Sequence, residues 1–238
     1  MANRVTGRGN PKNTVLKSIT SKLQQIDAEM KNQAATIIKV GSKRQLTSGE
    51  IAMSRLIFKD AIDYSKVWIH LGGLIHTKTG NAMTPAGEIY LPKDDYLKTP
   101  DYSKATGENR HWFIHQMVHG WQYQMGTSTG WLGIKQLCKG GYTSEVNSVD
   151  SDNELEAYDT DLGGRDLNKK FQDFNFEQQG RIIEFWFDAC YLQKVNPKRD
   201  HHQKSLQLLG YVEKILRDFL LNPSNKNFMK AQRNYVLI

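Results

Sequence analysis

The chain of 238 residues lacks most of the features that mark disulfide-rich and membrane proteins. Its only cysteines are Cys138 and Cys190, too few for a disulfide framework and not spaced as in a zinc ribbon. No apolar run approaches the roughly 20 residues that cross a bilayer, and residues 1–8 lack the apolar core of a signal peptide. We therefore expect no membrane span, and we favour two free thiols over a disulfide.

The chain also lacks any run of lysine and arginine. Its formal net charge of +7 favours anionic partners such as nucleic acid, acidic lipid or bacterial cell-wall polymer. The basic residues are scattered, however, and no nucleic-acid recognition motif accompanies them. We therefore expect no nucleic-acid partner.

The most informative stretch covers residues 110–125. Read as a helix, it places His115 and His119 one turn apart, with about 5–6 Å between their Cβ atoms. Two imidazoles in this relation can bind one zinc ion at about 2.0–2.1 Å from each nitrogen. On a neighbouring face the helix carries a continuous apolar stripe, made of Ile114, Met117, Val118, Trp121 and Met125.

The same histidine spacing occurs in the H-E-x-x-H motif, whose glutamate is the general base. Here Gln116 occupies the glutamate position. In a chain with seven histidines the pair alone is a weak signal, and two ordinary histidines on a half-buried helix would give the same spacing. His111 extends the row, but eight residues of helix rise about 12 Å, which is too far for His111 and His119 to share an ion.

Four segments carry a family resemblance: residues 46–52, 82–90, 112–124 and 174–179. In this order they resemble the zincin-type zinc-metallopeptidase-like proteins found around bacterial type VI secretion, often described as Rhs- or Vgr-related. The likeness covers about residues 46–193, and its most specific parts are the histidine helix with Trp121-Gln122 and the later Glu177-Gln178-Gln179. That family normally has H-E-x-x-H, so Gln116 is a departure that keeps metal binding and puts hydrolysis in doubt.

The pattern and the resemblance together predict an α+β, mostly α-helical fold with a small β-sheet ahead of the metal-binding helix. We expect residues 1–45 to form a flexible lead and an amphipathic helix from about Pro11. Residues 46–238 are expected to form one zincin-like unit. Within it we expect a helix capped by Thr47 or Ser48, strands near 67–71 and 88–91, a surface loop over 93–109, and a helix over 201–219 that begins with a surface pair, His201-His202.

A zinc ion held by two histidines needs a further protein ligand. The two main candidates are Glu177 and Glu154, of which the resemblance favours Glu177. Glu154 lies in a segment similar to the N-E-x-x-[SA] helix of thermolysin-like enzymes. Weaker alternatives are Glu156, Asp159, Asp161, His70 and His76.

The helix around Glu177 is apolar on nearly all sides, which is typical of a buried helix. Only Glu177, Arg181, Glu184 and Asp188 form a narrow polar stripe. The stripe faces either a strip of solvent, with ion pairs along the helix, or an internal polar site. In the second interpretation Gly180 leaves room for the histidine helix.

These observations predict a zinc-dependent amide hydrolase of the metallopeptidase type, an effector or toxin associated with type VI secretion. Its substrate would be protein or peptidoglycan peptide, and its partners a secretion-system or immunity protein. Glutamine can hold a water but is not a base, so we expect zinc binding with little turnover. Three explanations stay open: an inactivated variant, a pseudoenzyme that binds a peptide or partner, and an enzyme that draws its base from elsewhere. We expect synthesis in the bacterial cytoplasm without a signal peptide and delivery into a target cell or its periplasm.

Overall fold

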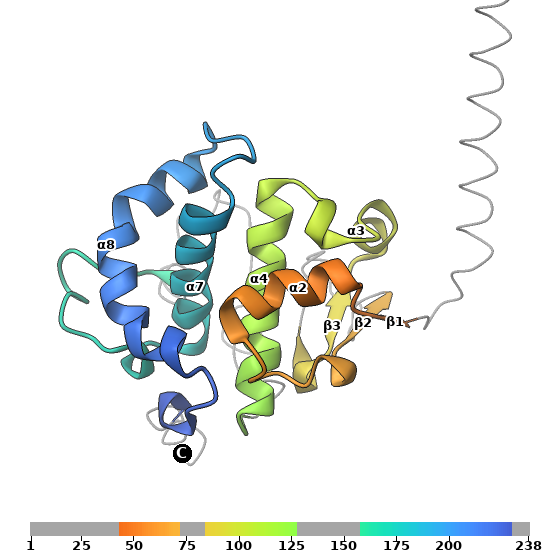
Figure 1. Ribbon diagram of the computed structural model, residues 1–238, viewed down its shortest axis with the longest axis horizontal. Helices are drawn as coiled ribbons and strands as arrows, with labels where there is room; N and C mark the ends of the chain where they lie inside the picture. Colours follow the sequence, from red (N-terminus) through yellow and green to blue (C-terminus); the bar gives the residue numbers. More distant parts are fainter. Residues whose placement is uncertain (1–42, 72–83, 128–157, 230–238) are drawn as a thin grey trace, which may run out of the picture. The chain divides into compact units, whose positions relative to one another are not determined.

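The computed structural model describes residues 43–71, 84–127 and 158–229 (Figure 1). The chain divides into two units, residues 1–42 and 43–238, and all described residues belong to the second. The helix expected from Pro11 and the candidate ligands Glu154, Glu156 and His76 lie outside the described residues. The expected boundary between residues 45 and 46 stays a prediction.

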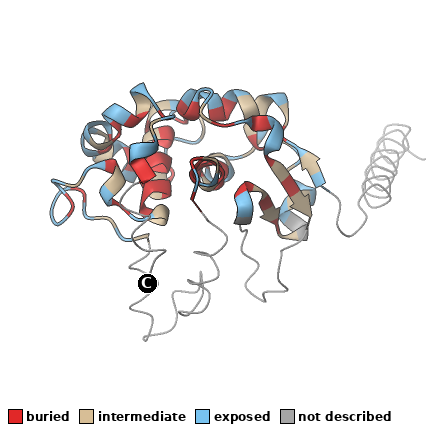
Figure 2. Cartoon of the chain, turned by 90° about the horizontal axis from the view of Figure 1, so that it is seen from below, coloured by how far each residue is buried: buried red, intermediate tan, exposed pale blue. Residues whose placement is uncertain are grey.

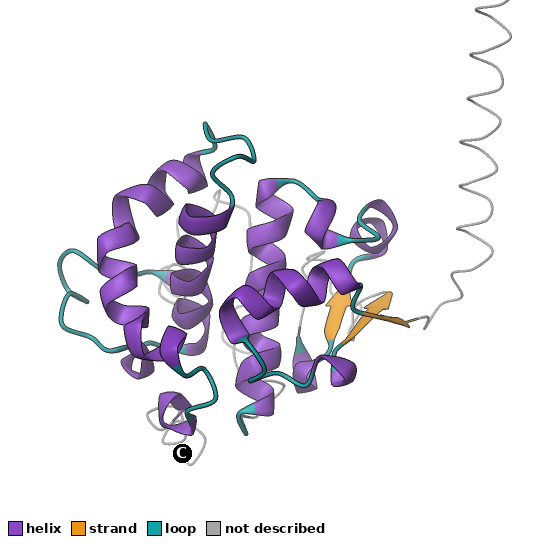
Figure 3. Cartoon of the chain, in the orientation of Figure 1, coloured by secondary structure: helices purple, strands orange, loops and turns teal. Residues whose placement is uncertain are grey.

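Helices dominate the described residues, and the strands gather at one side (Figure 3). This confirms the expected mostly helical α+β class. The helices are α2 (Ser48–Phe58), α3 (Lys93–Lys98), α4 (Gly107–Gln124), α7 (Phe176–Tyr191) and α8 (Asp200–Leu221), and the strands are β1 (Lys43–Gln45), β2 (Trp68–Leu71) and β3 (Ile89–Leu91). The expected N-cap of α2 is Thr47, and it forms a capping box with Glu50, since each side chain accepts from the other's backbone N–H, at 3.1 and 2.8 Å.

The sheet has the strand order β1-β2-β3. β1, which the sequence analysis did not predict as a strand, pairs antiparallel with β2, and β3 pairs parallel with β2. Ile69 on β2 lies opposite Ile89 on β3, and both are fully buried. On the other face His70 stacks on Tyr90, with ring centroids 4.3 Å apart. One face of the sheet therefore joins the core while the other carries polar side chains.

Helix α4 packs against α7, and α8 packs on α7 (Figure 1). Buried positions line both α4 and α7 (Figure 2). All five residues of the predicted apolar stripe on α4 are buried. Because α4 is covered on several sides, His111 and His115 are buried, and the side chain of His119 is only 13% exposed.

Two local expectations were wrong. Residues 93–109 are not one loop, since α3, the short 3₁₀ helix Tyr102–Lys104 and the start of α4 lie there. Asp101 caps that 3₁₀ helix by accepting from the Ser103 backbone at 3.0 Å, which shows that such polar residues begin helices as readily as they form loops. His202, expected at the surface, is buried because its ring bonds Asp188 beneath α8.

None of the described helices is both long enough and apolar enough to span a membrane.

Candidate metal centre

Two helices supply the side chains of the site, and both begin at well-formed caps. Thr106 caps α4 by accepting from the backbone N–H of Asn109 at 3.3 Å. Asn175 and Gln178 form a capping box at α7, with hydrogen bonds of 2.8 and 3.1 Å. The cap at Asn175 sets the register of α7, so that Glu177 lies in its first turn, opposite the α4 histidines.

The three predicted ligands come together. The Nε2 atom of His115 lies 2.9 Å from Oε2 of Glu177 and 3.1 Å from Nε2 of His119. The third side of the triangle, from Nε2 of His119 to Oε2 of Glu177, measures 3.3 Å. Ligands held at about 2.0–2.1 Å in a tetrahedral shell are separated by roughly 3.3 Å, so the donor atoms have the spacing that a small metal ion needs.

Glu184 fixes the other side of the His115 ring. Its Oε1 atom lies 3.4 Å from Nδ1 of His115, and its Oε2 atom accepts from Arg181 at 3.4 Å. A carboxylate behind a histidine orients the ring and directs the free nitrogen towards a metal. Glu184 is 4% exposed, so this arrangement is screened from bulk water.

The electrostatics of the cluster centre on His115. Burial lowers the pKa of His115, but the carboxylates of Glu184 and Glu177 raise it further, to about 10. Burial raises the pKa of Glu177, while His119 and His115 hold it well below its ordinary value. Both pKa shifts follow from the close approach of the two imidazoles to the carboxylates of Glu177 and Glu184.

His119 is oriented by an amide rather than a carboxylate. Its Nδ1 atom lies 2.8 Å from Oε1 of Gln122. The Nε2 group of Gln122 in turn donates to the Phe176 carbonyl at 3.1 Å and to Oε1 of Gln179 at 2.9 Å. Both glutamines are fully buried. They belong to the two most specific motifs of the family resemblance, and the fold brings these motifs into contact.

Gln116 points towards the strand region. Its Oε1 atom accepts a hydrogen bond of 2.6 Å from the hydroxyl of Thr84, and both side chains are buried. The amide group of Gln116, next to His115 in the sequence, is therefore held in one orientation by Thr84, which lies ahead of the 3₁₀ helix Pro85–Gly87 and β3.

Gly180 is where α7 passes the His115 ring. A Cβ atom at this position would lie 2.5 Å from Cε1 and 2.7 Å from Nδ1 of His115. The expected role of Gly180 in making room for the histidine helix is therefore confirmed. The polar stripe of α7 faces an internal polar site and not a strip of solvent, since Glu184 and Asp188 are buried.

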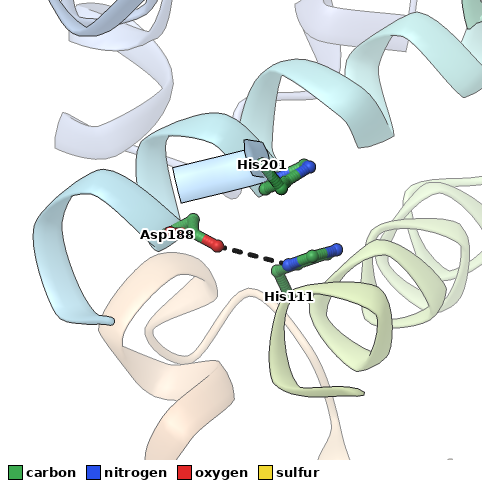
Figure 4. Close-up of side chains that lie close together, drawn as sticks. All are labelled: His111, Asp188 and His201. Carbon is green, nitrogen blue, oxygen red and sulfur yellow. Dashed lines mark hydrogen bonds and ion pairs between the residues drawn. The ribbon is translucent and has the colours of Figure 1, made fainter. Parts of the chain in front are cut away.

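A second cluster lies one turn from His115 towards the N-terminus of α4 and one turn from Glu184 towards the C-terminus of α7. Asp188 accepts from His111 at 3.2 Å (Figure 4). It also accepts from Nη1 and Nη2 of Arg199 at 2.8 and 3.0 Å. His202 is its fourth partner. His111 also stacks on His201, with centroids 3.8 Å apart and planes 15° apart (Figure 4). His111, Asp188 and His201 could hold a metal ion by proximity alone, with ligand atoms within 4.8 Å of one another.

The two clusters differ in how far their carboxylate is already occupied by hydrogen bonds. Asp188 already accepts four hydrogen bonds, two of them from a buried guanidinium whose charge opposes a second cation. The nearly parallel rings of His111 and His201 also direct their lone pairs side by side rather than towards one point. The first cluster is therefore the better candidate for a metal site, and the second is a buried ion-pair network.

The weaker candidate ligands that the structure describes lie in other interactions. His70 bonds Glu88 at 2.6 Å, and Asp159 bonds Arg165 at 2.9 Å. Asp161 accepts from the Arg165 backbone at 2.9 Å. None of the three joins His115, His119 and Glu177.

Comparison with known proteins places these features in a broader context. No protein-family model matches the chain. It is 30% identical over 145 residues to the type VI secretion system spike protein VgrG2b of Pseudomonas aeruginosa, a match that covers 60% of this chain and 13% of that protein. The chain is similar to a small part of a secretion spike. Its structure aligns with the solved effector domain of Pseudomonas aeruginosa VgrG2b at a TM-score of 0.49 and 23% identity, covering 76% of this chain and 90% of that domain.

The sequence similarity supports the predicted association with type VI secretion. The zincin-type assignment stays a prediction. The sequence analysis did not identify Gln122, Gln179 and Thr84 as parts of the site. Gln122 and Gln179 stood in the most specific motifs, so their position could have marked them, but only the fold shows which atoms they contact.

Proposed function

We propose that this chain is a zinc-binding effector of the metallopeptidase type, associated with type VI secretion, whose hydrolytic step is impaired at Gln116. His115, His119 and Glu177 would hold the ion. The observation that carries the proposal is the convergence of their three ligand atoms within 2.9–3.3 Å, with a separate partner behind each imidazole.

Zinc supplies a Lewis acid and a bound water of lowered pKa to such a site. The residues of this chain supply the rest. Glu184 and Gln122 orient the two imidazoles, and the largely buried surroundings exclude bulk water. Thr84 holds the side chain at position 116, where a glutamate would accept the proton of the attacking water. A glutamine amide accepts and donates hydrogen bonds but takes up no proton.

The proposed substrate is an amide bond in protein or in a peptidoglycan peptide, and the proposed partners are a secretion component and an immunity protein. The similarity to a spike protein supports delivery into a target cell or its periplasm. The net charge of +7 would favour contact with an anionic envelope.

Gln116 itself favours a second function. A site that keeps its metal and loses its base can still bind a carbonyl compound without cutting it. In that case the chain is a zinc-stabilised module that binds a peptide or a secretion partner.

The first test is the zinc content of the purified protein by elemental mass spectrometry. We expect about one zinc per chain in the parent and a loss in His115→Ala and Glu177→Ala. His70→Ala is the matched control, since His70 also pairs with a carboxylate but lies outside the site. No zinc in the parent, or equal zinc in all variants, would overturn the proposal.

The second test restores the base. Gln116→Glu is expected to raise amide hydrolysis by about 10²–10⁴-fold over the parent, measured on peptide and peptidoglycan-peptide substrates. Gln116→Met in the same assay controls for a change of packing. A zinc-loaded Gln116→Glu protein without activity or toxicity would favour the binding module.

A further inference from the structure

Gln122 of α4 and Gln179 of α7 form a buried chain of amide groups that ends at His119 of α4. Each is fully buried, and each uses both ends of its amide group. The chain begins at the backbone carbonyl of Phe171, 3.1 Å from Nε2 of Gln179, and ends at Nδ1 of His119.

The direction of every hydrogen bond in this chain follows from its first member. A backbone carbonyl only accepts, so the group of Gln179 that faces Phe171 is the NH₂ and its other end is the oxygen. That oxygen requires a donor from Gln122, and the Phe176 carbonyl requires the same NH₂ group. The Gln122 oxygen is therefore left to face His119, where it can only accept.

This direction decides the protonation of the imidazole. An acceptor at 2.8 Å from Nδ1 requires the proton of neutral His119 to be on Nδ1. Its Nε2 atom then carries the lone pair and faces Glu177 and His115. The opposite tautomer would place two acceptors, the Nδ1 lone pair and the Gln122 oxygen, against each other inside the protein, which is unfavourable for buried polar groups.

We propose that Gln122 and Gln179 are positioning residues that hold His119 in the metal-binding tautomer. This inference rests on the proposed metal site. Neutral amides suit the position, because Glu177 and Glu184 already place two carboxylates in the same interface. A third carboxylate behind His119 would add a buried negative charge that the glutamine avoids.

This chain of amides, called the relay below, also links His119 to residues that do not contact it. Gln179 is on α7 and bonds the Phe171 carbonyl ahead of that helix, with Phe228 O at 3.5 Å as a further neighbour. Loss of Gln179 is therefore expected to affect His119 through Gln122 alone. The effect should be smaller than that of losing Gln122, since Phe176 still holds the Gln122 amide.

The test compares Gln122→Leu, Gln179→Leu and Gln122→Glu with the parent. Gln124→Leu is the matched control, because Gln124 is on the same helix and bonds the backbone of Asp63, away from the site. Three quantities are measured: the zinc dissociation constant by competition with a chromophoric chelator, the His119 tautomer by ¹⁵N NMR of zinc-free protein above the ordinary histidine pKa, and the melting temperature of zinc-free protein.

We expect Gln122→Leu to weaken zinc binding by about 10–100-fold and to mix the His119 tautomers. Gln179→Leu should shift both quantities in the same direction by less. Gln122→Glu keeps an acceptor for Nδ1–H, so it should retain the tautomer and bind zinc more tightly than Gln122→Leu, although it loses both donated hydrogen bonds. A role in packing alone would make the Leu and Glu variants alike in zinc affinity.

Two results would overturn the relay. One is an Nε2–H tautomer in the zinc-free parent, and the other is a folded Gln122→Leu protein with the zinc affinity of the parent. If Gln122→Leu does not fold, Gln179→Leu and Gln122→Glu still decide. A parent that binds no zinc but shows the Nδ1–H tautomer would contradict the proposed function and leave the relay intact.

Discussion

The ring of His115 occupies the space that a side chain at Gly180 would need. A Cβ atom there would lie 2.5 Å from Cε1 of the ring, well inside van der Waals contact. The absence of a side chain at one position of α7 thus lets His115 of α4 lie between Glu177 and Glu184. The same contact therefore serves the packing of the two helices and the geometry of the candidate metal site.

Gly180→Ala is expected to displace the His115 ring and to weaken zinc binding by at least tenfold. We also expect it to lower the free energy of unfolding by about 1–3 kcal/mol, as for other overpacked cores. Zinc titration and urea unfolding measure the two effects.

Gly210→Ala on α8 is the control for this substitution. A Cβ atom at Gly210 meets no atom within 4 Å. Since alanine favours the helix, this variant should be more stable by up to about 1 kcal/mol and bind zinc like the parent. Unchanged zinc binding in Gly180→Ala would contradict the close packing of the two helices.

Asp188 is expected to contribute stability that acid removes. Burial raises the pKa of Asp188, but hydrogen bonds from His111, Arg199 and His202 lower it further, to well below its ordinary value. The folded protein therefore binds fewer protons than the unfolded chain. This contribution is present above the unfolded aspartate pKa of about 3.9 and is lost as the pH falls through the folded pKa.

Asp188→Asn should cost about 3–5 kcal/mol, because it leaves the buried Arg199 guanidinium with only the more distant and exposed carboxylate of Glu108, at 3.6 Å. Urea unfolding at several pH values measures both effects, and the variant should lose less stability than the parent below pH 4. The control is Asp159→Asn, which removes an exposed ion pair to Arg165 and should change little. A small effect of Asp188→Asn at pH 7 would refute the ion-pair network.

The neighbouring histidines 201 and 202 are expected to respond in opposite ways to replacement by phenylalanine. His201 has a buried Nε2 atom with no hydrogen-bond partner among the described residues, and its ring stacks on Phe185 at 5.2 Å. Burial and the neighbouring His111 lower its pKa to about 4. His201→Phe should therefore keep or raise the unfolding free energy, by up to about 1 kcal/mol.

His202→Phe removes a hydrogen bond to buried Asp188 and should cost about 1–3 kcal/mol. Because the folded pKa of His201 is depressed, the parent loses stability as the pH falls from about 6.5 towards 4, and His201→Phe should remove that part of the slope. Thermal unfolding across this pH range measures both variants, and equal losses in the two would contradict the assignment.

The sequence by itself determined the helices and the candidate ligands. The 3.6-residue period of the apolar residues determined α4, α7 and α8, and the i,i+4 relation placed His115 and His119 on one face. These features are local, since each depends on residues within a few turns of one chain segment. For the same reason, short polar stretches such as 93–109 were misread, because caps and loops use the same residues.

Only the tertiary structure decided how the polar residues of α4 and α7 pair. Along that interface histidines alternate with carboxylates: His119, Glu177, His115, Glu184, His111 and Asp188. The sequence could not show that Glu184 contacts His115 while Asp188 accepts from Arg199. Nor could it show that Gln122 bonds Gln179, 57 residues later. These pairings depend on the angle and register at which two helices pack, which the core and Gly180 set over long sequence separations.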